Sequence, residues 1–132
     1  MTQEDKELLL KDLCSRIPYG VKMNHIADEE ICPLTLVGVA KDMITLQGGG
    51  GYACTCVEDY TPYLFPLSSM TEEQKYEYHE LIHSNNIKSI EGVITSTDCS
   101  VAEIDWLLKN HFDYRGLIPK GLAIDATGLN IY

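Results

Sequence analysis

The segment His79-Glu80-Leu81-Ile82-His83 has the residue types and spacing of a catalytic metal site. In a helix, histidines four positions apart lie on one face and can bind one zinc ion, while the glutamate between them polarises a metal-bound water. One hypothesis for function is therefore a zinc-dependent hydrolase. His79 and His83 would be the zinc ligands and Glu80 the catalytic residue.

The surrounding sequence weakens this hypothesis. The motif lacks the extension that supplies a third histidine in one class of zinc proteases. Four residues could supply a third ligand, and no pattern selects among them: Glu91, Asp98, Glu103 and His111. Tyr78, Leu81 and Ile82 form the apolar stripe of the predicted helix, which is expected to end near Ser84, so the histidine pair lies beside the stripe. We favour a solvated histidine pair, with no metal and no cofactor.

Two other patterns were tested for chemistry. Gly48 to Gly51 are consecutive glycines, but no Gly-Lys-Ser/Thr follows them, so a phosphate-binding loop is excluded. Cys54 and Cys56 lie on the same side of a predicted strand, yet no second pair of ligands completes a zinc site. We expect both to be small core residues. No Gly-x-Ser-x-Gly or similar pattern joins a nucleophile to a base, so no catalytic residue is predicted.

Composition indicates one acidic domain. The 132 residues fit a single domain over 1–132, and 45% are apolar. The formal net charge of -10 has no compensating basic cluster, which argues against direct binding to a nucleic-acid backbone. No apolar run is long enough to span a membrane, and 1–6 is polar rather than a secretory signal. The five cysteines are an odd number, which favours reduced thiols and a cytoplasmic protein.

The first part of the chain is predicted to form a helix and then a short strand. Thr2 and Asp5 form a capping box for a helix that runs to about Ser15. A short strand is expected over 21–25, followed by an acidic turn over 27–30.

A β-rich segment is predicted over 34–57. The apolar alternation changes phase around Gly38, which indicates either a strand buried on both faces or a β-bulge. A turn is expected at 41–42 and a hairpin loop at 48–51. This segment should supply most of the sheet.

The middle of the chain is predicted to leave the sheet. Pro62 and Pro66 favour an extended connector over a central strand across 60–67. Thr71 and Gln74 then form a capping box for the helix that carries the histidine pair.

The last part of the chain is predicted to hold a third helix. A short strand or an irregular segment is expected over 87–97. Ser100 and Glu103 form a capping box, and the helix ends before Gly116. The apolar tail over 122–132 either adds an edge strand or docks on a partner chain.

Large side chains concentrate near the end of the third helix, in Trp106, His111, Phe112, Tyr114 and Arg115. The favoured interpretation is a packing corner in which the rings cover a core and Arg115 pairs with Asp113 or a nearby carboxylate. The alternative is an interaction surface, because Trp, Tyr and Arg are enriched at binding hot spots.

Four segments stand out as 8–22, 63–73, 105–107 and 111–118, and the most distinctive stretch in them is Phe-Asp-Tyr-Arg-Gly-Leu. In these segments the chain resembles small uncharacterised proteins of gut Bacteroidetes, many of them on prophages or other mobile elements. In that group, the helix after Ser-Met-Thr-Glu-Glu is charged and lacks the histidine pair. The resemblance implies a cytoplasmic, accessory setting and no known activity.

These observations predict an α+β domain with a small antiparallel sheet of three to five strands, covered on one face by about three helices. The expected function is that of a non-enzymatic accessory or regulatory protein. It would act through a protein partner or by self-association, using the surface near Trp106, Tyr114 and Arg115 and the glycine hairpin.

Overall fold

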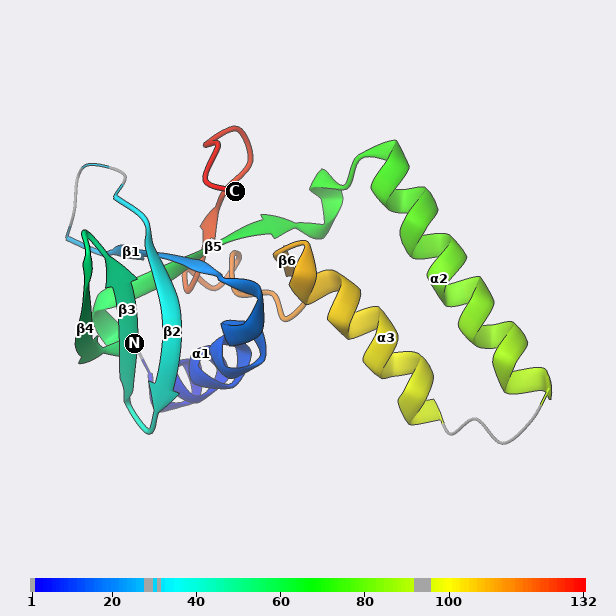
Figure 1. The fold of residues 1–132 in the computed structure, drawn as a ribbon, viewed down its shortest axis with the longest axis horizontal. Helices are drawn as coiled ribbons and strands as arrows, with labels where there is room; N and C mark the ends of the chain where they lie inside the picture. The colour runs from blue at the N-terminus through cyan, green and yellow to red at the C-terminus, as the bar shows by residue number, and fades with distance from the viewer. Residues whose placement is uncertain (1, 28–29, 31, 92–95) are drawn as a thin grey trace.

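The structure, a computed structural model, describes residues 2–27, 30, 32–91 and 96–132, with side chains outside 82–101. Its helices and strands, drawn in Figure 1, are α1 (Gln3–Arg16), β1 (Lys22–His25), β2 (Leu34–Ala40), β3 (Met43–Gly48), β4 (Gly51–Cys56), β5 (Tyr60–Pro66), α2 (Glu72–Glu91), α3 (Ser96–Lys109), β6 (Phe112–Asp113) and β7 (Ile124–Asp125). Short 3-10 helices cover Ile17–Tyr19, Val57–Asp59 and Leu67–Ser69. No helix in the described part of the chain is long and apolar enough to cross a membrane.

The described strands form one mixed sheet of seven strands in the order β4-β3-β2-β1-β5-β6, and β7 also pairs with β5. Neighbours from β4 to β5 are antiparallel, whereas β6 and β7 run parallel to β5. The α+β class is confirmed, but the sheet is larger than the predicted three to five antiparallel strands. Two-residue strands such as β6 and β7 are too short to leave a periodic signal in the sequence.

The predicted connector over 60–67 is wrong, because β5 lies inside the sheet. It pairs with β1 through Tyr60 to Pro62 and with β6 through Phe65 and Pro66. Both prolines occupy the last pair of a ladder, where a missing N–H costs least. Tyr63 and Leu64 are buried between these ladders.

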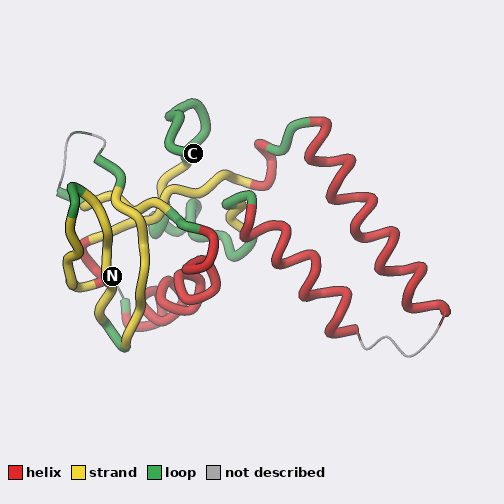
Figure 2. The backbone as a smooth tube through the Cα atoms, in the orientation of Figure 1, coloured by secondary structure: helices red, strands yellow, loops and turns green. Residues whose placement is uncertain are grey.

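Among the described α-helices, α1 packs its buried residues on the sheet, and α3 meets the sheet where it leads into β6. Buried residues of α1, the strands and the C-terminal segment form one core: Leu9, Leu13, Val21, Met23, Leu36, Ile44, Leu46, Val57, Leu64, Leu117, Leu122 and Ala123. Helices α2 and α3 form an antiparallel pair that extends away from the sheet (Figure 2). The prediction that about three helices cover one face is therefore wrong.

The two C-terminal helices are longer than predicted. Helix α2 continues past Ser84 to Glu91, and α3 begins at Ser96, so the helix start at Ser100 is wrong. The strand or irregular segment predicted over 87–97 is wrong for 87–91 and 96–97, which are helical, and 92–95 lie outside the described residues. Asparagine costs only about 0.5 kcal/mol more than a good helix former inside a helix, which explains why Asn85 does not end α2.

Local signals elsewhere are confirmed. The Asp5 N–H donates to Thr2 Oγ1 at 3.1 Å, and Thr71 and Gln74 exchange two capping hydrogen bonds of 3.1 and 2.9 Å. A register shift between Leu36 and Gly38 is the predicted bulge. Of the acidic turn, Asp28 and Glu29 lie outside the described residues.

Candidate functional site

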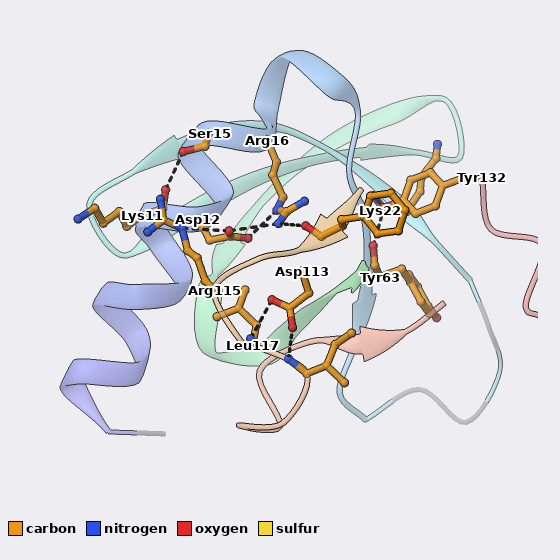
Figure 3. Close-up of polar contacts among 12 residues, drawn as sticks. Lys11, Asp12, Ser15, Arg16, Lys22, Tyr63, Asp113, Arg115, Leu117 and Tyr132 are labelled. Carbon is orange, nitrogen blue, oxygen red and sulfur yellow. Dashed lines mark hydrogen bonds and ion pairs between the residues drawn. The ribbon is translucent and has the colours of Figure 1, made fainter. Parts of the chain in front are cut away.

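A buried ion pair fixes the end of α1 to β6 (Figure 3). Asp12 and Arg16 face each other one helical turn apart, with both side chains fully buried and Arg16 Nε 2.6 Å from Asp12 Oδ2. Arg16 Nη2 also donates to the backbone oxygen of Phe112 at 2.7 Å. The spacing of the pair places both groups on one face of α1. Sequence reasoning missed this site, because a charged i, i+4 pair is usually a solvated one.

The segment after β6 completes this contact. Arg115 Nε lies 3.2 Å from Asp12 Oδ1, so Asp12 faces two guanidinium groups. Both arginines also lie over the Tyr114 ring, with Arg16 Cζ at 5.8 Å and Arg115 Cζ at 5.0 Å from its centroid. Asp113 instead accepts the N–H groups of two residues that follow it, each at 2.9 Å. The pairing of Arg115 with a nearby carboxylate is confirmed. We call Asp12, Arg16, Asp113, Tyr114 and Arg115 the polar junction.

A stacked pair of rings holds the last residues beside the junction. The rings of His111 and Tyr132 are stacked, with centroids 3.7 Å apart. Tyr132 Oη accepts the Lys22 N–H and donates to the Tyr63 oxygen, each at 2.8 Å. Burial, with Arg16 and Lys22 nearby, lowers the pKa of His111 to about 4, and burial raises the pKa of Tyr132 to about 12. The tail thus adds β7 and also docks on its own chain.

The predicted interaction surface is largely a packing corner. Phe112 is 1% exposed and stacks on Trp106, whose ring also contacts Tyr78 of α2. His111, Tyr114 and Arg115 are half-buried and have the contacts given above. The structure therefore places these residues together, but mainly against one another. A role for them in partner binding stays a prediction.

The histidine motif does not gather a metal site in the described residues. His79 and Glu80 are exposed on α2, and the side chain of His83 lies outside the described ones. No three His, Cys, Asp or Glu side chains in the described part of the chain are grouped to hold a metal ion. Of the four possible third ligands, His111 is stacked on Tyr132 and the side chains of Glu91 and Asp98 are not described. The zinc hypothesis stays a prediction.

Cys54 and Cys56 are exposed, so their prediction as core residues is wrong. Strand β4 pairs with β3, and the buried residues of β3 are Ile44 and Leu46. Residues of the opposite phase therefore line the other face, which we call the β3–β4 outer face: Met43, Thr45, Gln47, Tyr52, Cys54 and Cys56. This face carries no charge, although the chain as a whole is acidic. Alternation in the sequence identified a shared face but not which face is buried.

Strand β4 also has one free edge, because β3 is its only partner among the described strands. Five of its six residues are exposed, and Tyr52 is 71% exposed. At the end of the strand, Lys6 pairs with Asp42 at 3.5 Å and with Glu58 at 2.8 Å. The edge is therefore neutral along its length, and two carboxylates that share Lys6 lie at its Cys56 end.

A small cavity of about 210 Å³ lies between β5, β6 and the start of α2. Its lining residues carry no charged side chain: Phe65, Ser69, Thr71, Gln74, Phe112, Thr127 and Gly128. Ligand pockets usually measure about 300–1,000 Å³, so this cavity is small for a substrate. It offers no acid, base or nucleophile beyond hydroxyl groups.

No family model, no curated protein and no solved structure matches this chain.

Proposed function

We propose that this chain is a non-enzymatic accessory or regulatory protein that acts in the cytoplasm through protein–protein contacts. We assign the contact to the free edge of β4. The observation that carries the proposal is that β4 has no second strand partner in the described structure and that Gly51 to Cys56 contain no charged residue and no proline.

Such an edge favours strand addition. An edge strand exposes backbone N–H and C=O groups that can pair with another chain, and most proteins protect such edges with charges, prolines or bulges. The register between β3 and β4 is continuous from Met43 to Gly48, so no bulge turns the edge away. A partner segment in extended form would add backbone hydrogen bonds here, and Tyr52 would supply a side-chain contact.

Charge selects the kind of partner. The formal net charge of -10 favours an extended segment that carries lysine or arginine, and so does the local excess of negative charge where Asp42 and Glu58 share one lysine, Lys6. A second copy of the chain would bring the same negative charge to the interface. We therefore propose a basic segment of another protein as the occupant.

A displayed library of random twelve-residue peptides tests this proposal. Selection on the full chain should enrich peptides that combine alternating β-branched residues with lysine or arginine. The amide resonances of β4 should shift most when a selected peptide is added. No enrichment, or shifts confined to another surface, would contradict the proposal.

A charge-matched pair of variants sharpens the test at one exposed position of β4. Ala53→Lys should weaken binding of the selected peptides about tenfold, because like charges repel, whereas Ala53→Glu should not weaken it. Equal losses in both variants would mean that charge at this edge does not select the partner.

Zinc hydrolysis is the rival function, and metal analysis of chelator-washed protein separates the two. Stoichiometric zinc that is lost in His79→Ala would favour the rival. The position of His79 on the exposed surface of α2 predicts no such loss. Measured hydrolysis that depends on Glu80 would also favour it.

Self-association is the alternative to a separate protein partner, and the proposed accessory setting predicts no dimer. A mass in solution equal to that of one chain is expected, because a second copy repeats the negative charge. A stable dimer that dissociates in Tyr52→Lys would instead identify a second copy as the occupant of the β4 edge. The resemblance to Bacteroidetes proteins of mobile elements stays a prediction.

A further inference from the structure

Three sulfur-containing side chains gather on the β3–β4 outer face. Met43 and Cys56 are directly opposite each other in the register of β3 and β4, and their sulfur atoms are 4.0 Å apart. Cys54 lies two residues before Cys56, so its side chain is on the same face of β4. Its sulfur lies 3.3 Å from Thr45 Oγ1. All three side chains are exposed, and Met43 is 40% exposed.

The distance between the sulfurs fits a shared metal ion. Metal–sulfur bonds are about 2.3 Å long, so two sulfurs 4.0 Å apart that bind one ion subtend an angle of about 120°. That angle is the one expected for three donors around one ion. Cys54 would become the third donor by a change of rotamer that exchanges its contact with Thr45 for the ion, because it lies two residues before Cys56 on the same face of β4.

We propose that Met43, Cys54 and Cys56 bind one copper(I) ion. Thiolate and thioether sulfurs are soft ligands that select copper(I), whereas zinc sites take four ligands drawn from cysteine, histidine and carboxylates. The β3–β4 outer face offers no histidine and no carboxylate. On binding, the two thiols release their protons and the ion keeps its charge state, so the step needs no oxidant or reductant.

Exposure of these sulfurs is the second argument. Cysteine is among the residue types most often buried, and a thiol in a core needs no ligand. Here both thiols and the thioether face outward from an edge hairpin, where packing does not require sulfur. This inference goes beyond the proposed protein contact, which uses the backbone edge of β4 and the Tyr52 side chain but none of the three sulfurs.

Anaerobic titration with copper(I) against a coloured copper(I) chelator tests the site. The full chain in which Cys14, Cys32 and Cys99 are changed to serine should retain one copper(I) per chain, with ultraviolet sulfur-to-copper absorption. In that background, Cys54→Ser or Cys56→Ser should abolish retention against the chelator. Met43→Leu keeps the side-chain volume and should weaken retention at least about tenfold.

Two controls make each result decisive. Met70→Leu removes a methionine outside the hairpin and should leave copper retention unchanged. Circular dichroism of each variant should match that of the background, because the three positions are exposed. Copper that is retained after both Cys54→Ser and Cys56→Ser would overturn the site. Equal retention in Met43→Leu and its background would overturn the three-sulfur assignment.

Discussion

The polar junction and the β3–β4 hairpin lie toward opposite ends of the sheet and are held in different ways. The junction is charged and its Asp12–Arg16 pair is fully buried, and its contacts join residues far apart in sequence, such as Arg16 and Phe112. The hairpin joins two neighbouring strands through a loop at Gly49 and Gly50, and its outer face is neutral and exposed.

The two regions are expected to have different roles, the polar junction in stability and the hairpin in binding. The junction connects α1, β6 and the residues after β6, so removing one of its charges leaves others buried and unpaired. The outer face of the hairpin has no buried charge that needs a partner. Substituting its side chains, or binding a ligand to them, should therefore change the free energy of unfolding little. We therefore expect stability to depend on the junction and contact with other molecules to depend on the hairpin.

The largest expected effect follows from removing Asp12. Asp12→Ala leaves the buried Arg16 and the partly buried Arg115 without their shared carboxylate. Breaking one partner of a buried ion pair costs about 3–5 kcal/mol. Urea unfolding should show a loss of this size in the free energy of unfolding.

Two comparisons control for the helix itself. Lys11→Ala changes the neighbouring, exposed residue of α1 and should alter stability by less than about 0.5 kcal/mol. Combining Asp12→Leu with Arg16→Met replaces the pair by apolar groups and should cost less than Asp12→Ala alone. If Asp12→Ala cost no more than Lys11→Ala, the junction would not support the fold.

The next effect is a pH dependence that arises beside the junction. Burial lowers the pKa of His111 to about 4, whereas an unfolded histidine titrates near its ordinary value of 6.5. As the pH falls from 6.5 to about 4, the unfolded chain binds a proton that the folded chain does not, so stability falls. The loss should be on the order of 1–3 kcal/mol, reduced by the partial exposure of the ring.

His111→Asn isolates this dependence. His111 has a φ of 61°, and asparagine accepts the left-handed region better than most residues. The free energy of unfolding of wild type and variant should be compared from pH 7 to pH 4. Carboxylates titrate in both proteins, so only the difference between the two curves reports His111. Parallel curves would show that His111 titrates normally in the folded chain.

Signals confined to a few residues made much of the fold predictable. The capping residues Thr2 and Thr71 each satisfy backbone N–H groups within one helical turn, and the bulge near Gly38 changes the phase of an alternation. The hairpin loop requires glycine, because Gly49 and Gly50 both have positive φ. Each feature is encoded by residues that are close in the sequence.

Features that depend on distant partners could not be predicted. Pro62 argues against a central strand until its place at the end of the β1 ladder is known. Asp12 and Arg16 look like a solvated pair until β6 covers them, and Cys54 looks like a core residue until β4 proves to be an edge. The β3–β4 outer face is therefore exposed where the sequence predicted core residues at Cys54 and Cys56.

A smaller effect is expected where the tail meets the sheet. Tyr132→Phe keeps the ring on His111 but removes the hydroxyl that accepts the Lys22 N–H and donates to the Tyr63 oxygen. The loss should be about 1–2 kcal/mol, because two backbone groups lose a partner. Tyr76→Phe is the matched control, since this tyrosine of α2 is exposed, and it should cost almost nothing. Equal losses would mean that the tail is not held by its hydroxyl.

Tyr52→Thr should have the smallest effect and is the most direct test of the difference between the two regions. Threonine keeps the β propensity of the position, and Tyr52 is exposed opposite Gln47, so the change should cost less than about 0.5 kcal/mol. Ile44→Val removes one buried methylene from the inner face of the same hairpin and should cost about 0.5–1.5 kcal/mol. If Tyr52→Thr cost as much as Ile44→Val, the outer face would contribute to folding. Its exposed tyrosine and sulfurs would then need no ligand or partner to explain them.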